Sequence, residues 1–383
     1  MMTNEATSVR SDDIATATVG ASSEPLHQPA EGPVVPGAAG DVDASPRVTR
    51  LEGFDGDALA HVLQGSTVRH AQLAAGRFNA RIYRVALEES MVESGTYNLP
   101  VHGQGHFPTD RVLLGTLLSN TGPAWISEEP FGRGDIVFCG PGAPLDVVLG
   151  HDAHWVAFGM PLSRLVEEAV QRDIRLPDRL DRVIVSRVSR ESFGQLDAAT
   201  RDVLDLVGDE PAALDDPTVR SGVERTVLHA YLKGLGSVQA EMEAGPSAGA
   251  ARRAAAARRT QVVRRVEEYI ESRPGAPIYL SELCAVTEVS ERTLRYVFEW
   301  RFGMSPIAYL RARRLCGVRR DLLRARGADI VVKDVARRWG YWHCGRLAAE
   351  YRTQFGESPS ETVGRPGRGR AGQGQSGEPR TST

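Results

Sequence analysis

The chain has 383 residues, 41% of them hydrophobic, which is enough material for more than one hydrophobic core. Its formal net charge is only −3, but residues 251–370 carry 25 Lys and Arg against 13 Asp and Glu, while residues 1–250 sum to −15. The basic part favours contact with phosphates, and the acidic part discourages nonspecific contact with nucleic acid.

The sequence lacks the signals of a membrane, secreted or disulfide-stabilised protein. No apolar run reaches the ~18 residues of a membrane span, and no charged start followed by an apolar run marks a secretory signal. The four cysteines are widely spaced, which argues against a disulfide framework or a zinc knuckle: Cys139, Cys284, Cys316 and Cys344. We therefore expect a cytoplasmic protein.

In the N-terminal half, a polar segment is followed by short runs that are apolar or in which apolar and polar residues alternate. Residues 1–45 are poor in large apolar groups and are predicted to be a disordered acidic and polar tail. Residues 46–165 contain short apolar or alternating runs between turn residues, which predicts a small antiparallel sandwich or barrel. The runs are Ala80–Leu87, Val112–Ser119, Ala124–Ser127, Asp135–Cys139, Leu145–Leu149 and Trp155–Met160.

The sequence predicts a helical subdomain next, followed by a linker. Residues 166–240 form a helical subdomain in which Val219, Val223, Val227, Tyr231 and Leu235 recur at every fourth position. Such a stripe covers the barrel, forms a dimer, or does both. Residues 241–260 are the expected linker between domains. Residues 365–383 are expected to be a disordered tail.

The C-terminal part contains two copies of a similar helical unit. Leu280–Val286 reads as a short helix, residues 287–289 as a tight turn, and Ser290 as the cap of a second helix. On that second helix Leu294, Val297 and Phe298 form an apolar stripe, with a polar face opposite. Helix, turn and helix with a polar outer face is typical of a DNA-binding helix-turn-helix unit.

Both units end in the same stop signal, Phe-Gly-x-Ser-Pro. Gly303 and Gly356 are placed to end a helix in the left-handed conformation, and a serine and a proline then start the next helix. The nineteen residues from Pro306 to Arg324 would form a rod of roughly 28 Å. That is close to the ~34 Å between successive major-groove faces of B-DNA.

These motifs resemble the AraC/XylS family of bacterial transcription regulators. The resemblance extends over about residues 262–364 and rests on Ser290–Leu294, Phe302–Leu310, Arg314-Leu315, Asp334–Ala336, Trp339–Tyr341 and Tyr351–Ser360. It implies a DNA-binding domain over residues 261–364, with helix-turn-helix units at about 280–303 and 332–356 joined by a helix at about 306–324. Residues 340–346 are also similar to the subgroup that includes ethanolamine-operon activators.

The resemblance implies which residues read DNA. Base-reading positions fall on Arg292, Arg295 and Tyr296 in the first unit, and on Cys344, Gly345, Ala348 and Ala349 in the second. Arginine pairs bidentately with guanine, whereas alanine offers only apolar contact, so we expect the first unit to carry most direct readout. Backbone contacts are expected from Ser290, His343, Arg346 and Arg352. Other residues are expected in the core: Trp339, Tyr341, Leu347, Tyr351 and Phe355.

Residues 46–165 resemble, more loosely, the cupin-like effector domain of these regulators, through Gly132–Phe138 and Pro141–Pro144. The implied fold is α+β, with an N-terminal cupin-like β-barrel or sandwich with helices and a C-terminal all-α double helix-turn-helix domain. The pairs His102 and His106, and His151 and His154, read as loop residues and lack the metal-binding pattern, so we expect no metal or cofactor. Effector-binding candidates are Arg81, Tyr83, Trp125 and Trp155.

We therefore expect a sequence-specific DNA-binding regulator, an activator rather than an enzyme, controlled by a small molecule or a partner through its N-terminal domain. The implied partners are double-stranded operator or promoter DNA, RNA polymerase, a small-molecule effector and a second copy of the chain, and the protein is nucleoid-associated when bound to DNA. No membrane contact is expected. Two alternatives stay open: a cupin-type metal enzyme with a DNA-binding appendage, and an architectural DNA protein without sequence preference.

Overall fold

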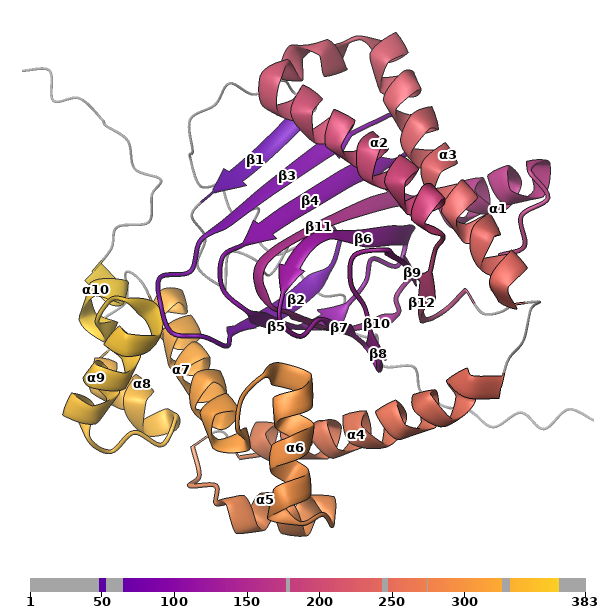
Figure 1. Ribbon diagram of the computed structural model, residues 1–383. Helices are drawn as coiled ribbons and strands as arrows, with labels where there is room; N and C mark the ends of the chain where they lie inside the picture. The colour runs from indigo at the N-terminus through magenta and orange to yellow at the C-terminus, as the bar shows by residue number, and fades with distance from the viewer. Residues whose placement is uncertain are drawn as a thin grey trace, which may run out of the picture. The chain divides into compact units, whose positions relative to one another are not determined.

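The computed structural model describes residues 48–52, 65–176, 180–242, 247–273, 275–325 and 331–364. Strands fill the first part of this range, and helices fill the last part (Figure 1). The α+β class predicted from the sequence is thus confirmed. The predicted tails, residues 1–45 and 365–383, lie outside the described residues. None of the helices in the described ranges is both long and apolar enough to cross a membrane.

The strands form two antiparallel sheets, which we call together the sheet region. The larger sheet has the order β1-β3-β4-β11-β6-β9-β12 and the smaller β2-β5-β10-β7-β8. The strands are β1 (Val48–Glu52), β2 (Thr67–Gln72), β3 (Ala80–Ala86), β4 (Met91–Tyr97), β5 (Val101–His106), β6 (Val112–Thr121), β7 (Trp125–Ile126), β8 (Glu129–Pro130), β9 (Asp135–Cys139), β10 (Pro144–Leu149), β11 (His151–Met160) and β12 (Val183–Arg187).

All six predicted runs are found in strands, but the histidine pairs were assigned wrongly to loops. His102 and His106 lie in β5, which pairs with β2 on one side and β10 on the other. His151 and His154 lie in β11. The glycines of β5 interrupt the apolar pattern by which a strand is recognised in a sequence. At Gly103 an added Cβ would lie 3.1 Å from Val147 Cγ1 and 3.2 Å from Val68 Cγ1, so glycine leaves room for side chains of both neighbouring strands.

Two cores hold this part together. One lies between the sheets and includes Val68, Val101, Leu113, Val137 and Leu145. The other lies between the larger sheet and helices that cross its outer face, α2 (Arg190–Asp209) and α3 (Pro217–Met242), with α1 (Leu162–Gln171) and the short η2 (Pro211–Asp215) beside them (Figure 1). In the stripe predicted for residues 219–235, Val227, Tyr231 and Leu235 are buried in that second core. The stripe therefore covers the sheet, and its role in dimerisation stays a prediction.

The segment expected to be a linker, residues 241–260, is largely helical. Helix α3 extends to Met242, and α4 spans Ser247–Glu271. Alanine and arginine are among the strongest helix formers, so the Ala/Arg run from residue 251 joins α4 instead of forming an irregular connection.

The helical region, α4 to α10, follows the predicted pattern closely. Its remaining helices are α5 (Leu280–Thr287), α6 (Glu291–Phe302), α7 (Pro306–Arg324), α8 (Val332–Arg338), α9 (Cys344–Phe355) and α10 (Pro359–Gly364). Ser290 and Ser305 accept hydrogen bonds from the backbone N–H groups of Thr293 and Ala308, which caps α6 and α7. Gly303 and Gly356 have φ of 68° and 72°, so both predicted glycine stops are confirmed.

Gly317 sets the distance between α7 and the second unit. An added Cβ at this position would lie 2.3 Å from the Trp339 ring, so any larger residue must displace the indole. We expect Gly317→Ala to lower the free energy of unfolding by about 1–3 kcal/mol because of this overpacking. Thermal and urea denaturation measure the loss.

Gly222 provides the control for this substitution, because it also lies in a helix, α3, and has no atom within 4 Å of an added Cβ. Gly222→Ala should leave the protein unchanged or stabilise it by roughly 0.5–1 kcal/mol, the usual helical preference for alanine. Equal effects of the two substitutions would show that Trp339 does not restrict the packing of α7.

Candidate nucleic-acid interface

Helices α6 and α9 occupy equivalent places in the two units, and we call them the reading helices. A shift of 53 residues places Gly303 on Gly356 and Ser290 on His343. The apolar faces correspond as well, because Leu294, Phe298 and Phe302 are buried in one core, and Leu347, Tyr351 and Phe355 are buried in another. Each reading helix therefore has one side packed and the other side turned to solvent.

The first reading helix presents its predicted base-reading residues. Arg292, Arg295 and Tyr296 are exposed. Arg295 donates from Nε and Nη2 to Glu291 Oε1, at 2.9 and 2.7 Å. Tyr296 supports the guanidinium of Arg259 from α4, which lies 5.2 Å from the tyrosine ring centre. The structure therefore brings together two arginines and an aromatic ring on one solvent-facing surface.

The second reading helix presents a smaller and less polar surface. Cys344, Gly345 and Ala349 are exposed and Ala348 is half-buried. Arg346 is exposed and donates from Nε to Glu350 Oε1 at 2.9 Å. His343 and Arg352, the other candidates for backbone contact in this unit, are exposed as well. Ser290, in the first unit, uses its hydroxyl to cap α6.

Sequence reasoning missed Trp342, the most exposed large aromatic side chain near α9. It is 72% exposed, whereas Val289, at the equivalent position of the first unit, packs against the core. The mismatch between the repeats was the available signal. The predicted core set is confirmed, since Tyr341, Leu347, Tyr351 and Phe355 are buried and Trp339 packs against them.

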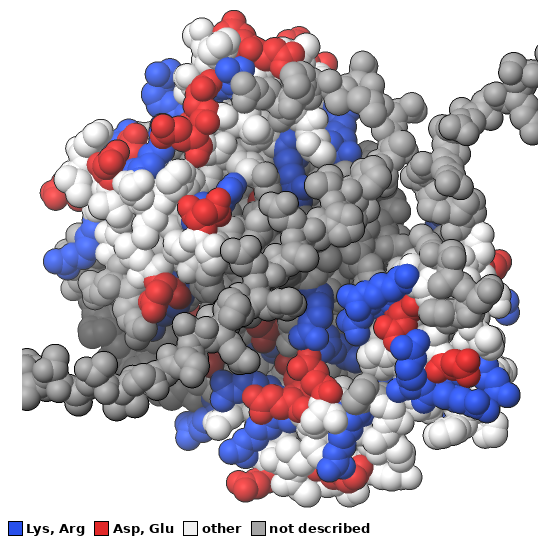
Figure 2. Space-filling model, turned by 180° about the vertical axis from the view of Figure 1, so that it is seen from behind, with Lys and Arg blue, Asp and Glu red and all other residues white. Residues whose placement is uncertain are grey.

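Charges of both signs are mixed around these helices. Figure 2 shows Lys and Arg interspersed with Asp and Glu over the lower part of the face that it displays. The ion pairs Arg295–Glu291 and Arg346–Glu350 are examples. The excess of basic residues in 251–370 still makes the net local charge positive, which predicts DNA affinity that falls steeply with salt.

The first reading helix is attached to the sheet region through Arg301. This side chain is fully buried and donates from Nη2 to Asp146 Oδ1 at 2.9 Å and from Nη1 to the Ser127 carbonyl at 2.7 Å. Trp300, the residue before it, packs against Trp125 with ring centres 3.9 Å apart and the ring planes tilted by 53°. The inner face of α6 is thereby fixed on β7 and β10.

A buried polar network continues from this contact. His102 of β5 faces Asp146 with Nε2, at 2.8 Å, and faces the Tyr309 hydroxyl with Nδ1, at 2.9 Å. Tyr309 donates in turn to Glu267 of α4. Burial alone would raise the pKa of the Asp146 carboxyl, but His102 and Arg301 outweigh it and lower the pKa to about 2. Asp146 is therefore held in its charged form as the acceptor for both neighbours.

The second reading helix is attached at the equivalent position. Gln354, 53 residues after Arg301, is buried and donates from Nε2 to the carbonyls of Gln72 and Ala74, at 3.0 and 3.1 Å. Gln72 donates back to the Gln354 carbonyl at 2.8 Å. Both reading helices thus contact the sheet region with the same position of the repeat.

The cluster around His102 contains residue types that can hold a metal ion. Within the described ranges, one group of three His, Cys, Asp or Glu residues has its possible metal-ligand atoms within 4.8 Å of one another. The group is His102, Asp146 and Glu267. However, Asp146 faces Nε2 of His102, and Glu267 faces the opposite nitrogen at 3.4 Å. The Arg301 guanidinium also contacts the same Asp146 oxygen. This geometry suits a hydrogen-bonded network, not a cation.

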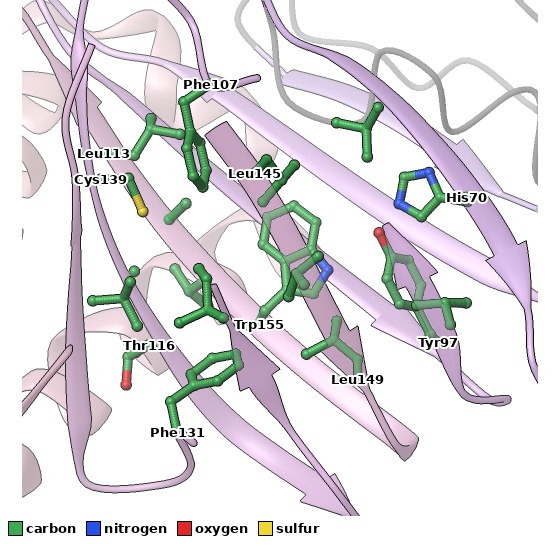
Figure 3. Close-up of a pocket in the computed structure, with 18 residues that line it drawn as sticks. His70, Tyr97, Phe107, Leu113, Thr116, Phe131, Cys139, Leu145, Leu149 and Trp155 are labelled. Carbon is green, nitrogen blue, oxygen red and sulfur yellow. The ribbon is translucent and has the colours of Figure 1, made fainter. Parts of the chain in front are cut away.

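The four effector-binding candidates do not form one site. Trp155 lines an apolar cavity of about 100 Å³ between the two sheets, shown in Figure 3 with His70 and Tyr97 near one end. Arg81 lies at a separate surface hollow, and Tyr83 packs on the helix-covered side of the larger sheet. Trp125 contacts Trp300 of α6. Burial lowers the pKa of His70 to about 4, so this imidazole is neutral at pH 7.

Arg301 supplies a test of the attachment. Arg301→Met should lower the free energy of unfolding by about 3 kcal/mol, because it leaves the half-buried Asp146 carboxylate without one of its two side-chain partners and removes the buried guanidinium contacts. Urea denaturation measures the change. The double variant Arg301→Met/Asp146→Leu should recover much of the loss, since replacing both partners of a buried pair by apolar groups is often neutral. A single variant as stable as the wild type would contradict the importance of this contact.

The helical region is similar to a known family of domains. Residues 283–365 match a family described as a helix-turn-helix domain. The chain is 38% identical over 102 residues to the probable thc operon regulatory protein of Rhodococcus erythropolis, which covers 27% of this chain and 31% of that protein. It is 36% identical over 99 residues to XylDLEGF operon transcriptional activator 2 of Pseudomonas putida, over 26% of this chain and 63% of that protein.

Among solved structures, a probable AraC family transcriptional regulator from Rhodopseudomonas palustris is 36% identical, with a TM-score of 0.25, over 27% of this chain and 94% of that one. The chain matches under two thirds of the length of either curated relative. Together with the paired reading helices and their glycine stops, the family match and the curated relatives show that residues 283–365 are a helix-turn-helix DNA-binding domain of the AraC/XylS type.

Proposed function

We propose that the protein is a sequence-specific transcription regulator that binds double-stranded DNA through both reading helices. The observation that carries the proposal is the repeated unit itself, with two equivalent helices whose outer faces are exposed and whose inner faces are held. Helix α7, with 19 residues, joins the units and is roughly 28 Å long. This length supports entry into successive major-groove segments on one face of the duplex.

Arg295 can change from its intramolecular partner to DNA. Its ion pair with Glu291 is exposed at both ends, 53% and 56%, and an exposed pair of this type contributes roughly 0.2–1 kcal/mol. A bidentate contact with guanine contributes about 1–3 kcal/mol of discrimination. The DNA contact therefore exceeds the pair that it replaces, and Glu291 keeps the arginine oriented until DNA arrives.

The second unit is proposed to hold the backbone and read shape. Its exposed face offers Cys344, Gly345 and Ala349, which lack the fork of donors that reads guanine. His343 and Arg346 lie at the first turn of α9 and Arg352 lies in its last turn, and we propose that all three contact phosphate. Such contacts fix the register of the protein on DNA and add little base preference.

Control is proposed to come from the sheet region, through a small molecule or a partner that prefers one arrangement of sheet and reading helices. The direct contacts of Arg301 and Gln354 with the sheet region support this route. Activation through RNA polymerase, pairing with a second copy and a cytoplasmic location at the nucleoid belong to the same proposal. A metal enzyme receives no support from the His102 cluster, whose ligand atoms face Arg301 and Tyr309.

Replacement of Arg295 tests base reading. Arg295→Ala should cost about 1–3 kcal/mol at one base pair and relax the preference there. Binding-site selection from random duplexes, carried out with wild type and variant, measures the change. Glu291→Gln should leave the selected motif intact, because it removes only the intramolecular partner of Arg295.

Arg225→Ala is the matched control, because Arg225 is an exposed arginine on α3, away from the reading helices. It should change neither motif nor affinity. The same motif from wild type and Arg295→Ala would contradict the assigned role of Arg295. Less than ~10³-fold preference over unrelated duplex at physiological salt would instead indicate an architectural protein without sequence preference.

A further inference from the structure

A second cavity, which we call the interregion cavity, lies where the sheet region meets the helical region. It has a volume of about 220 Å³, and its walls come from β2, α4, α7 and Trp339. Because a water molecule needs roughly 10–15 Å³ of such space, the cavity can hold a small organic molecule. The cavity of Figure 3 has walls from the sheet region alone, whereas the contents of the interregion cavity would touch the sheet region and the helical region.

The charge of the interregion cavity is strongly positive. Four arginines line it against a single carboxylate, that of Glu271: Arg69, Arg313, Arg314 and Arg320. Arg69 and Arg313 both approach the same oxygen of Glu271, Oε1, at 3.1 and 3.4 Å. One carboxylate thus serves two guanidinium groups, and donors on both remain available to a further anion.

Arg314 shows the excess of positive charge most clearly. It is half-buried, it donates from Nη2 to the Ala276 carbonyl, and burial lowers the pKa of its guanidinium. A neutral carbonyl does not balance a buried cation. Trp339 and Ile270 add apolar surface.

We infer that the interregion cavity binds a small organic anion, a carboxylate or a phosphate ester with a flat or apolar body, and that this anion regulates DNA binding. Guanidinium groups form charge-assisted, often bidentate, hydrogen bonds with both head groups. Ile270 and Trp339 would contact the body of the ligand. The regulatory part of this inference rests on the proposed function, whereas the binding site does not.

The cavity is connected to the contact that holds the first reading helix. Glu267 and Glu271 lie one turn apart on α4, and Tyr309 and Arg313 lie one turn apart on α7. Glu267 pairs with Tyr309 in the network that reaches Asp146 and Arg301, and Glu271 pairs with Arg313 at the cavity. An anion that draws Arg313 away from Glu271 therefore acts one helical turn from the Glu267–Tyr309 pair, which is linked through His102 and Asp146 to Arg301.

Calorimetric titration of the full chain, without DNA, tests the site. The probes are phenylacetate and phenyl phosphate, with 2-phenylethanol as the neutral analogue. At least one anion should bind with a Kd of about 1 mM or tighter, and the alcohol should not bind. A preference for phenylacetate would identify a carboxylate ligand, and a preference for phenyl phosphate a phosphate ester. Failure of both anions to bind would overturn the inference.

Three substitutions locate the binding. Arg69→Gln and Arg314→Gln should each weaken the anion by about tenfold, the loss of one charge-assisted hydrogen bond. Glu271→Gln should tighten it, because the competing carboxylate is removed, and this opposite direction cannot arise from misfolding. Arg225→Gln, on α3, should have no effect. Anion affinities that stay the same in the Arg69, Arg314 and Glu271 variants would show adventitious binding elsewhere and overturn the assignment.

The regulatory part is measured separately, by fluorescence anisotropy with a duplex obtained from binding-site selection. Saturating anion should change the Kd for DNA by roughly fivefold or more, and Arg314→Gln should reduce that change. DNA affinity that is unaffected by bound anion would overturn regulation while leaving the site intact. Absence of any specific DNA binding would refute the proposed function, and the calorimetric result would still stand.

Discussion

The buried guanidinium of Arg301 is the constraint on which the arrangement of the reading helices depends. An arginine that is fully buried requires a carboxylate and further acceptors, because an unpaired charge in the interior costs several kcal/mol. Asp146 and the Ser127 carbonyl supply them from the sheet region. Helix α6 therefore cannot leave the sheet region without either exposing this pair to water or leaving Asp146 without its cation.

Gln354 attaches α9 to the sheet region in the same way, but through hydrogen bonds between neutral groups. Its amide makes reciprocal hydrogen bonds with Gln72, and both residues are neutral, so separation costs less than breaking the Arg301 pair. The two attachments lie at equivalent positions of the repeat but differ in strength. A ligand that loosens the sheet region should therefore release the second reading helix before the first. The spacing between the helices then depends on α7 alone.

The helical region could be predicted almost residue by residue because its signals are local. Gly303, Ser305 and their repeats at Gly356 and Ser358 fix helix ends within a few residues, and no distant contact is needed to read them. Strand β5 was missed because its pairing partners, β2 and β10, are distant in sequence, and its glycines conceal the alternating pattern. Arg301 is a charged residue on a helix with an exposed polar face, so its residue type does not predict burial. Its burial depends on Asp146, 155 residues away, which no local pattern indicates.

The difference between the reading helices follows from how their exposed faces are built. Arg292 and Arg295 offer long side chains with several donors, and Glu291 restricts where the second of them points. The corresponding face of α9 is formed by Gly345, Ala348 and Ala349, so the backbone of that helix can approach DNA more closely than α6 can. Under the proposed function, a close approach would bring Trp342, which is 72% exposed, near the sugar-phosphate chain. Small residues on α9 and one large aromatic before it would then suit a unit that fits the width of the groove, and α6 would identify the bases.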